Sequence, residues 1–239
     1  MKKIGILLLC VLLAGLTACT VSEKEEEPFS AAFTIRETSA PTEVFFGEPV
    51  PAVGSADLPD SLSYDAIEHL FVTSLFGDQG QVLCLWNQPI QYALNGGFSQ
   101  MDAQTAGEIA DALSDVSGFP GIRETTADQA NVQITFAGVP AADCNIAADS
   151  NGNILRAEIT IPTNGKFDRA KALRQSLFRI CGMLYQAETV LDTVNAESYA
   201  ATKPTDTDWM LMDILYSEMQ AGMSKEECRT ALDAHFKAQ

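Results

Sequence analysis

Histidine is scarce in this sequence, which holds only His69 and His235 among its 239 residues. Two imidazoles cannot supply a three-histidine metal centre, and they leave few candidates for a general base. The sequence also lacks a P-loop, a dinucleotide-binding glycine motif and a nucleophile elbow. These absences remove the commonest signatures of nucleotide-binding proteins and of serine hydrolases.

Basic residues are also few. Lysine and arginine number 15 against 32 aspartates and glutamates, so the formal net charge is −17 at pH 7. Binding to nucleic acid needs a basic surface, and so does electrostatic docking on anionic lipid headgroups. Neither function is therefore expected of this chain. A hydrophobic content of 46% with twelve phenylalanines favours a folded chain over disorder.

The one long apolar run, residues 4–16, is too short to span a bilayer comfortably, since a span needs about 20 residues. Lys2 and Lys3 precede it, so residues 1–18 are predicted to be an export signal. The segment Leu16-Thr17-Ala18-Cys19 resembles the bacterial lipobox. That resemblance implies that Cys19 is diacylated and becomes the N-terminus, which anchors an exported protein to the outside of the cell membrane. The alternative is an ordinary signal with a chance cysteine.

No CxxC pair is present among the cysteines, so a structural zinc site built from thiolates is not expected. With Cys10 in the signal and Cys19 lipidated, four cysteines remain in the expected domain. In an exported chain they permit two disulfides in three connectivities, and buried free thiols are the alternative. The four are Cys84, Cys144, Cys181 and Cys228.

Residues 19–58 are predicted to be the lipidated cysteine and a flexible tether, because they contain the charge run 22–28 and four prolines. Four phenylalanines in this stretch are candidates for local docking on the domain: Phe29, Phe33, Phe45 and Phe46. Residues 59–239 are predicted to form a single α+β domain.

Hydrophobic periodicity and capping residues place the elements of this domain. Helices are expected near 61–76, 99–116 and 167–186, with two more beginning after Thr205 and Ser224. Strands are expected at 88–94, 121–126, 131–137, 144–148 and 154–162, with 144–148 at an edge. The pattern predicts a mixed, mostly five-stranded sheet packed on two long helices, with C-terminal helices.

This order of elements resembles the catalytic domain of metzincin-type zinc peptidases. There a five-stranded sheet precedes a helix with the motif H-E-x-x-H-x-x-G-x-x-H, whose histidines bind zinc and whose glutamate is the general base. The matching stretch here is 175–185. It keeps Gly182 in register but has Gln175, Arg179 and Tyr185 at the ligand positions and Ser176 at the base position. The resemblance therefore implies a zincin-like fold that has lost its metal.

Further motifs carry the same resemblance. After the active-site turn, metzincins often continue as S/T-x-x-D-x-x-x-L-x-x-L-Y, which Thr205 to Tyr216 match with methionine at the first leucine. The chain also resembles an uncharacterised family of exported bacterial proteins with an eroded zinc motif. The segments that match that family are Trp86-Asn87-Gln88-Pro89, Asn131-Val132-Gln133-Ile134, Gly152-Asn153-Ile154-Leu155-Arg156-Ala157 and Gly222-Met223-Ser224-Lys225-Glu226-Glu227.

The expected function is therefore a cell-envelope lipoprotein with a catalytically inactive, zincin-like binding or scaffolding domain that needs no cofactor. A peptide or protein ligand could add as a strand to an edge of the sheet. Three alternatives stay open: a hydrolase that uses Ser176 or Cys181, a lipoprotein that captures a solute or peptide, and an unrelated α+β domain. In the last, 168–186 is only an amphipathic helix with Gln175, Arg179 and Gln186 facing water.

Overall fold

The computed structural model describes residues 31–35, 63–78, 80–165, 167–189, 191–196 and 203–237, with only the backbone path of 31–35. The expected export signal, the expected lipid-attachment residue Cys19 and most of the expected tether lie outside these ranges. No helix within the described ranges is both long enough and apolar enough to cross a membrane.

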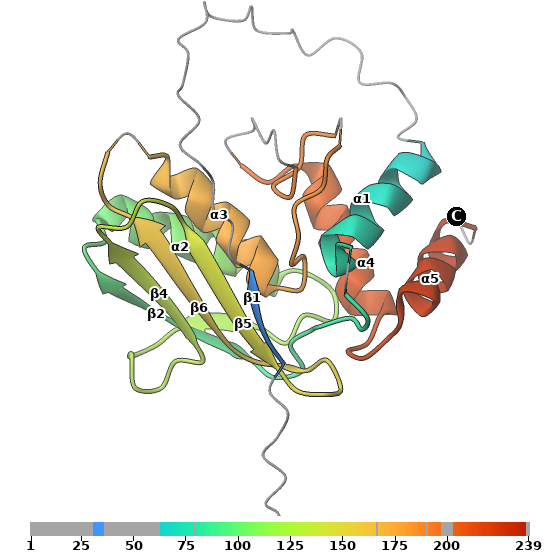
Figure 1. The fold of residues 1–239 in the computed structure, drawn as a ribbon, viewed down its shortest axis with the longest axis horizontal. Coiled ribbons are helices and arrows are strands. Elements are labelled where there is room, and N and C mark those ends of the chain that lie inside the picture. Colours follow the sequence, from blue (N-terminus) through green and yellow to red (C-terminus); the bar gives the residue numbers. More distant parts are fainter. Residues whose placement is uncertain are drawn as a thin grey trace, which may run out of the picture.

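The described residues form an α+β fold with a mixed sheet and C-terminal helices, as the sequence predicts (Figure 1). Its helices are α1 (Tyr64–Phe76), α2 (Gln100–Ser114), α3 (Arg169–Ile180), α4 (Asp206–Glu218) and α5 (Lys225–Lys237). Its strands are β1 (Ala31–Ile35), β2 (Ile90–Gly96), β3 (Ile122–Glu124), β4 (Val132–Ala137), β5 (Asp143–Ala148) and β6 (Ile154–Pro162).

The described sheet has the strand order β1-β5-β6-β4-β2-β3. Strands β3, β2, β4 and β6 are parallel to one another, whereas β5 runs antiparallel to β6 and to β1. The five expected strands are all present. The expectation that 144–148 lies at an edge is wrong, because β1, from the segment expected to be a tether, pairs along the outer side of β5.

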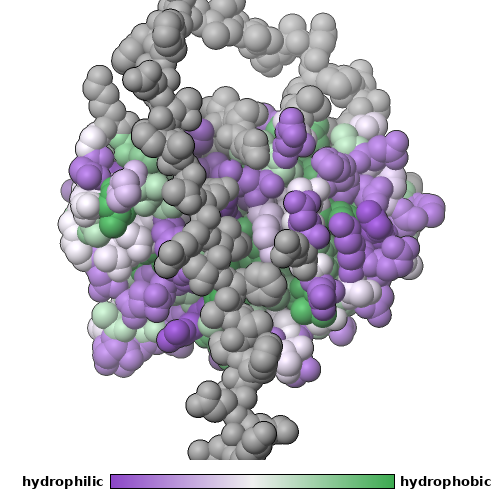
Figure 2. Space-filling view, viewed as in Figure 1, coloured by the Kyte–Doolittle hydropathy of each residue, from purple (hydrophilic) through white to green (hydrophobic). Residues whose placement is uncertain are grey.

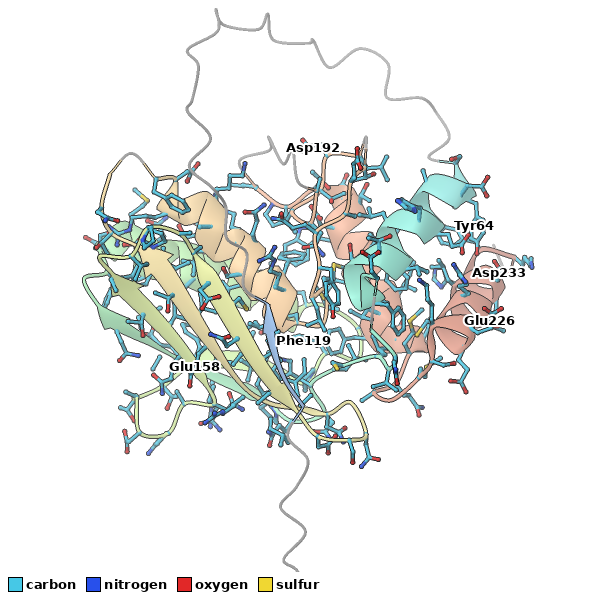
Figure 3. All side chains as sticks on the ribbon, in the orientation of Figure 1. Tyr64, Phe119, Glu158, Asp192, Glu226 and Asp233 are labelled. Atoms are coloured by element: carbon cyan, nitrogen blue, oxygen red, sulfur yellow. The ribbon has the colours of Figure 1, made fainter. Side chains whose placement is uncertain are left out.

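One face of the sheet is covered by α2 and α3, which also pack against each other (Figure 1). Strand β4 alternates buried and half-buried residues, as a strand with one covered face should. On β6 the side chains of Leu155, Arg156 and Glu158 are exposed. Figure 3 shows Glu158 on the face of the sheet opposite α2 and α3. The core of this part therefore lies between the sheet and the two helices.

Helices α1, α4 and α5 form a second group, in which α5 packs against both α1 and α4. The Tyr64 hydroxyl of α1 donates a hydrogen bond to the Asp233 carboxylate of α5, and Figure 3 shows the two side chains together. Arg229 Nε donates to Glu68 Oε1 at 2.9 Å and joins the same two helices. Figure 2 shows hydrophilic residues gathered over α1 and α5 on the viewed face.

Capping residues begin the helices where the sequence predicts them. Ser99 and Asp102 form a capping box at α2, and Thr205 and Asp208 form another at α4. Ser224 forms the same reciprocal bonds with the Glu227 carboxylate at the start of α5. The Asp102 carboxylate also pairs with the Arg169 guanidinium, which ties α2 to the first turn of α3.

Helix α3 is shorter than predicted, because it ends at Ile180 and not at Gln186. Gly182 follows with φ +107°, a conformation that side chains with a Cβ rarely adopt. A Cβ at this position would lie 2.8 Å from Leu85 Cδ2 and 3.0 Å from the Cys84 carbonyl oxygen. The glycine is therefore required both by its backbone angle and by the close approach of residues 84–85.

Candidate functional site

The residues that match the zinc motif lie on the last two turns of α3 and just beyond it. Gln175 is half-buried, whereas Ser176 and Arg179 are buried, at 4% and 9% exposure. The alternative expectation that Arg179 faces water is therefore wrong. The helix ends near Gly182, as the motif requires, and the chain turns away from the helix axis. The structure thus brings Gln175, Ser176 and Arg179 onto one short length of helix.

Tyr185, at the position of the third ligand, is directed towards α1. Its N–H donates to the Ser74 carbonyl at 3.0 Å. A Cβ on Gly77, which caps α1, would lie 2.7 Å from Tyr185 Cδ1, so the ring packs directly on this glycine. Tyr185 therefore joins the end of α1 to the segment after α3.

These residues do not fit a zinc ion. A guanidinium has no lone pair to donate and keeps a positive charge at all ordinary pH values, so Arg179 opposes a dication. The histidines cannot replace it, because His69 is exposed on α1 and His235 lies on α5, with Nδ1 3.6 Å from Glu218 Oε1. Within the described ranges, no three residues among histidine, cysteine, aspartate and glutamate come together as metal ligands.

The geometry also gives no support to a relocated nucleophile. Cys181 is fully buried after the last turn of α3, and burial raises the pKa of its thiol well above the ordinary value. A nucleophilic cysteine needs the opposite shift, since the thiolate is the reactive form. Ser176 is buried on a helix that carries neither histidine. Neither residue therefore has the environment of an activated nucleophile.

All four cysteines of the domain are buried free thiols, so the disulfide alternative is not what this structure contains. Burial raises the pKa of Cys144 to about 12, although the charge of Arg179 lowers it in part. Burial likewise raises the pKa of Cys228 to about 12. Thiols in this environment behave as small apolar side chains of the core.

The outer edge of β5 is the most distinctive feature for recognition. Five residues of β1 pair with it antiparallel, from Ala31 opposite Ala148 to Ile35 opposite Cys144. Strands β1 and β5 are far apart in the sequence, so no hairpin turn imposes their pairing. The edge therefore accepts a separate length of extended chain by backbone hydrogen bonding, which is the geometry of strand addition.

A pocket of about 320 Å³ lies at the C-terminal end of β5. Its walls come from the end of α1, the segment 80–84, the start of the β5–β6 hairpin and the segment after α3. Tyr185 is one of its lining residues, so the pocket adjoins the position that matches the third ligand of the zinc motif. The Asp149 carboxylate, also in the lining, accepts the N–H groups of Asn151 and Asn153 at 2.9 and 2.8 Å.

Residues 82–86 connect this pocket to the rest of the domain, and they lie outside every helix and strand expected from the sequence. The Leu85 N–H donates to the Gly152 carbonyl, and the Leu85 carbonyl accepts the Ile154 N–H. Leu83 exchanges similar bonds with Met223 and Gly222 in the α4–α5 loop. A short extended segment therefore joins the β5–β6 hairpin to that loop. Its uninterrupted apolar sequence was the only available signal.

The motif residues that carry the family resemblance have structural contacts around this segment. The Trp86 indole donates to the Ile180 carbonyl, at the end of α3, at 2.6 Å. Asn87 Nδ2 donates to Asn153 Oδ1 at 2.8 Å. Asn131 accepts the Gln91 N–H at 2.7 Å and thereby aligns the starts of β2 and β4. These residues hold backbone segments together and do not converge on a reaction centre.

The chain matches no model of a protein family and no curated protein.

Proposed function

We propose that this chain is an exported, lipid-anchored protein of the cell envelope whose domain binds an extended peptide, without catalysis, as a strand added to β5. The observation that carries the proposal is the pairing of β1 with the outer edge of β5. An edge that already pairs with one extended segment offers the same row of backbone donors and acceptors to another.

The length of chain between β1 and the rest of the domain allows β1 to be exchanged for a peptide at the edge of β5. Residues 36–62 separate β1 from the first described residue before α1. A link of this length holds the strand near its edge at an effective concentration on the order of 1 mM. A peptide ligand would compete against that concentration for the edge of β5. The chain's own strand would thus act as a resident competitor.

We propose no catalysis because of the residues at and beside the positions that match the zinc ligands. Arg179 is buried where a metal ligand would stand, and burial raises the pKa of the Cys181 thiol. We also propose a zincin-like relationship. Its support is that the five strands β2–β6 precede a helix that ends near a glycine in register with the motif. Membrane anchoring is proposed from Lys2, Lys3 and the lipobox-like sequence before Cys19.

The proposal is tested by competing the resident strand with a labelled peptide. The probe is a fluorescein-labelled peptide of residues 30–36, added to the full chain in detergent. In the double variant Ala32→Pro/Phe33→Pro, at least one N–H directed at β5 is lost, because adjacent residues of a strand point their N–H groups in opposite directions. We expect the variant to bind the peptide at least tenfold more tightly than the wild-type chain, by fluorescence anisotropy.

A matched control places the same two prolines outside β1, as Thr38→Pro/Ser39→Pro. This variant keeps the resident strand and should bind the peptide as weakly as the wild-type chain. Equal binding by all three chains, or binding by none, would overturn the proposed strand addition at β5.

Anchoring has its own test. In a bacterial host, Cys19→Ala removes the only thiol at the lipobox-like site, and it should move the chain from the membrane fraction to the soluble fraction. Substitution of Cys10, inside the expected signal, serves as the control. An unchanged membrane fraction for Cys19→Ala would contradict lipidation at this residue.

A further inference from the structure

The pocket at the end of β5 lies next to the first residue of β1. Ala148 is part of its lining and is also the register partner of Ala31. The other side chains that shape it are mainly apolar or aromatic: Leu75, Val82, Cys84, Leu184 and Tyr185. Its 320 Å³ lies at the low end of the range for ligand pockets, and suits one large side chain better than a drug-sized molecule.

The register determines which positions of an added strand lie on the side of the pocket. Ala148, Ile146 and Cys144 are the buried positions of β5, on the face covered by the helices. Residues directly opposite one another in an antiparallel pair lie on the same face of the sheet. Ala31 is opposite Ala148 and therefore takes a register position on that face.

Because side chains alternate along a strand, the register of Ala31 also determines the face of the residues before it in an extended continuation of β1. Positions two apart along a strand share a face and are separated by about 7 Å. Phe29 precedes Ala31 by two residues, so an extended continuation of β1 would carry it to the pocket side of the sheet. Ser30 would take the opposite face. The sequence thus has a large apolar residue two positions before Ala31, the residue that pairs with Ala148 at the wall of the pocket.

We propose that this pocket is a side-chain subsite of the β5 edge and that Phe29 of the chain's own N-terminal segment is its occupant. The inference rests on the proposed strand addition at β5, because it takes the position of Phe29 from that strand. It follows that a peptide replacing β1 binds more tightly when it presents a large apolar side chain two residues before the residue that pairs with Ala148.

The rate at which the Cys84 thiol is labelled reports whether the pocket is filled, because Cys84 lines the pocket and is only 7% exposed. The full chain in detergent is treated with N-ethylmaleimide, and labelling of each cysteine is followed by peptide mass spectrometry. We expect Phe29→Ala to increase the labelling rate of Cys84 at least fivefold. Cys144 and Cys181, buried elsewhere in the core, should keep their wild-type rates and so report that the variant remains folded.

Two further variants separate side-chain fit from general effects on the segment. Phe29→Leu keeps a large apolar side chain and should restore most of the protection of Cys84. Phe45→Ala removes a phenylalanine from the same N-terminal region and should leave Cys84 at the wild-type rate. If Phe29→Ala leaves the Cys84 rate unchanged, or if Phe45→Ala raises it equally, Phe29 is not the occupant.

Other occupants give recognisable results that overturn the proposal. Protection of Cys84 that survives in Phe29→Ala and increases with protein concentration would indicate a second copy of the chain. The peptide experiment distinguishes a failure of the proposed strand addition at β5 from a failure of the proposed side-chain subsite. If the proline variant binds the 30–36 peptide but Phe29→Ala leaves Cys84 unchanged, strand addition stands and the subsite fails. If both hold, a longer peptide of residues 28–36 should bind at least tenfold more tightly than its Phe29→Ala counterpart.

Discussion

The hydroxyl of Tyr216 donates a hydrogen bond of 3.0 Å to the carbonyl oxygen of Cys181, the residue that caps α3. The last carbonyls of a helix have no partner within the helix, and a buried one must be satisfied from elsewhere. Trp86 does the same for the neighbouring carbonyl of Ile180. Two residues of the motifs on which the zincin-like resemblance was based thus stabilise the place where α3 ends and the chain turns.

Tyr216→Phe tests this contact by removing a single oxygen atom. The Cys181 carbonyl would stay buried without its donor, so we expect the free energy of unfolding to fall by about 1–2 kcal/mol. Urea denaturation followed by circular dichroism gives this quantity. Tyr92→Phe is the matched control, since Tyr92 is also buried and its hydroxyl makes no hydrogen bond to the described residues. Equal losses in the two variants would contradict the assigned role.

Gly152 provides a second prediction, because it joins the β5–β6 hairpin to residues 82–86. Its φ is +77°, and a Cβ there would lie 2.2 Å from the Leu83 carbonyl oxygen and 2.7 Å from the Gly222 nitrogen. Gly152→Ala therefore adds a backbone clash to the cost of an unfavourable φ, which alone is about 1 kcal/mol. We expect a loss of about 3 kcal/mol or more in the free energy of unfolding.

Gly165 is the matched control for this substitution. Its φ is +79°, almost the same, but a Cβ there would meet nothing within 4 Å. Gly165→Ala should therefore cost only the contribution of φ, about 1 kcal/mol. If the two alanine variants have the same urea midpoint, the close approach of Leu83 and Gly222 to the hairpin is not a source of stability.

Local signals in the sequence were sufficient for most of the elements. Capping boxes at Ser99 and Thr205 and the alternation of β4 and β6 depend on residues within one element, so short-range patterns predict them. The end of α3 was harder to place. Leu184 continues the apolar periodicity beyond Gly182, and only the approach of Leu85 and Cys84 shows why the helix must end earlier.

The candidate site depends on contacts between distant segments, and no local pattern reveals these. The sequence of β1 lies among prolines and charged residues, which favour a tether, and its pairing with β5 is purely tertiary. The pocket likewise combines four separate segments around Tyr185. The motif at 175–185 marks the positions that match zinc ligands, but the burial of Arg179 depends on how the helix packs in the fold.

Zinc binding is the third prediction. Because Arg179 contributes charge and no lone pair, we expect the purified full chain to retain less than about 0.1 zinc per chain after zinc loading and desalting. Elemental analysis gives the content. The double variant Gln175→His/Arg179→His places two imidazoles one turn apart, a spacing that binds zinc on helices, and it should gain metal as a positive control. Near-stoichiometric zinc in the wild-type chain would refute the assignment of these positions as eroded ligands.

The last prediction concerns Asp208, which is 1% exposed and caps α4. Burial raises its pKa from 3.8 to about 6, although hydrogen bonds from Thr205 and Val194 oppose the shift. A raised carboxyl pKa means that this group favours the folded state at low pH, and that its contribution is lost as pH rises from about 4 to about 6. Asp208→Asn should lose a constant amount of stability because the cap is weakened. Its side chain does not titrate, so the pH-dependent contribution of residue 208 should be absent from the variant. The difference in unfolding free energy between variant and wild type should therefore move by about 1 kcal/mol in favour of the variant from pH 5 to pH 7. A difference independent of pH would show that Asp208 keeps its ordinary pKa and stays ionised.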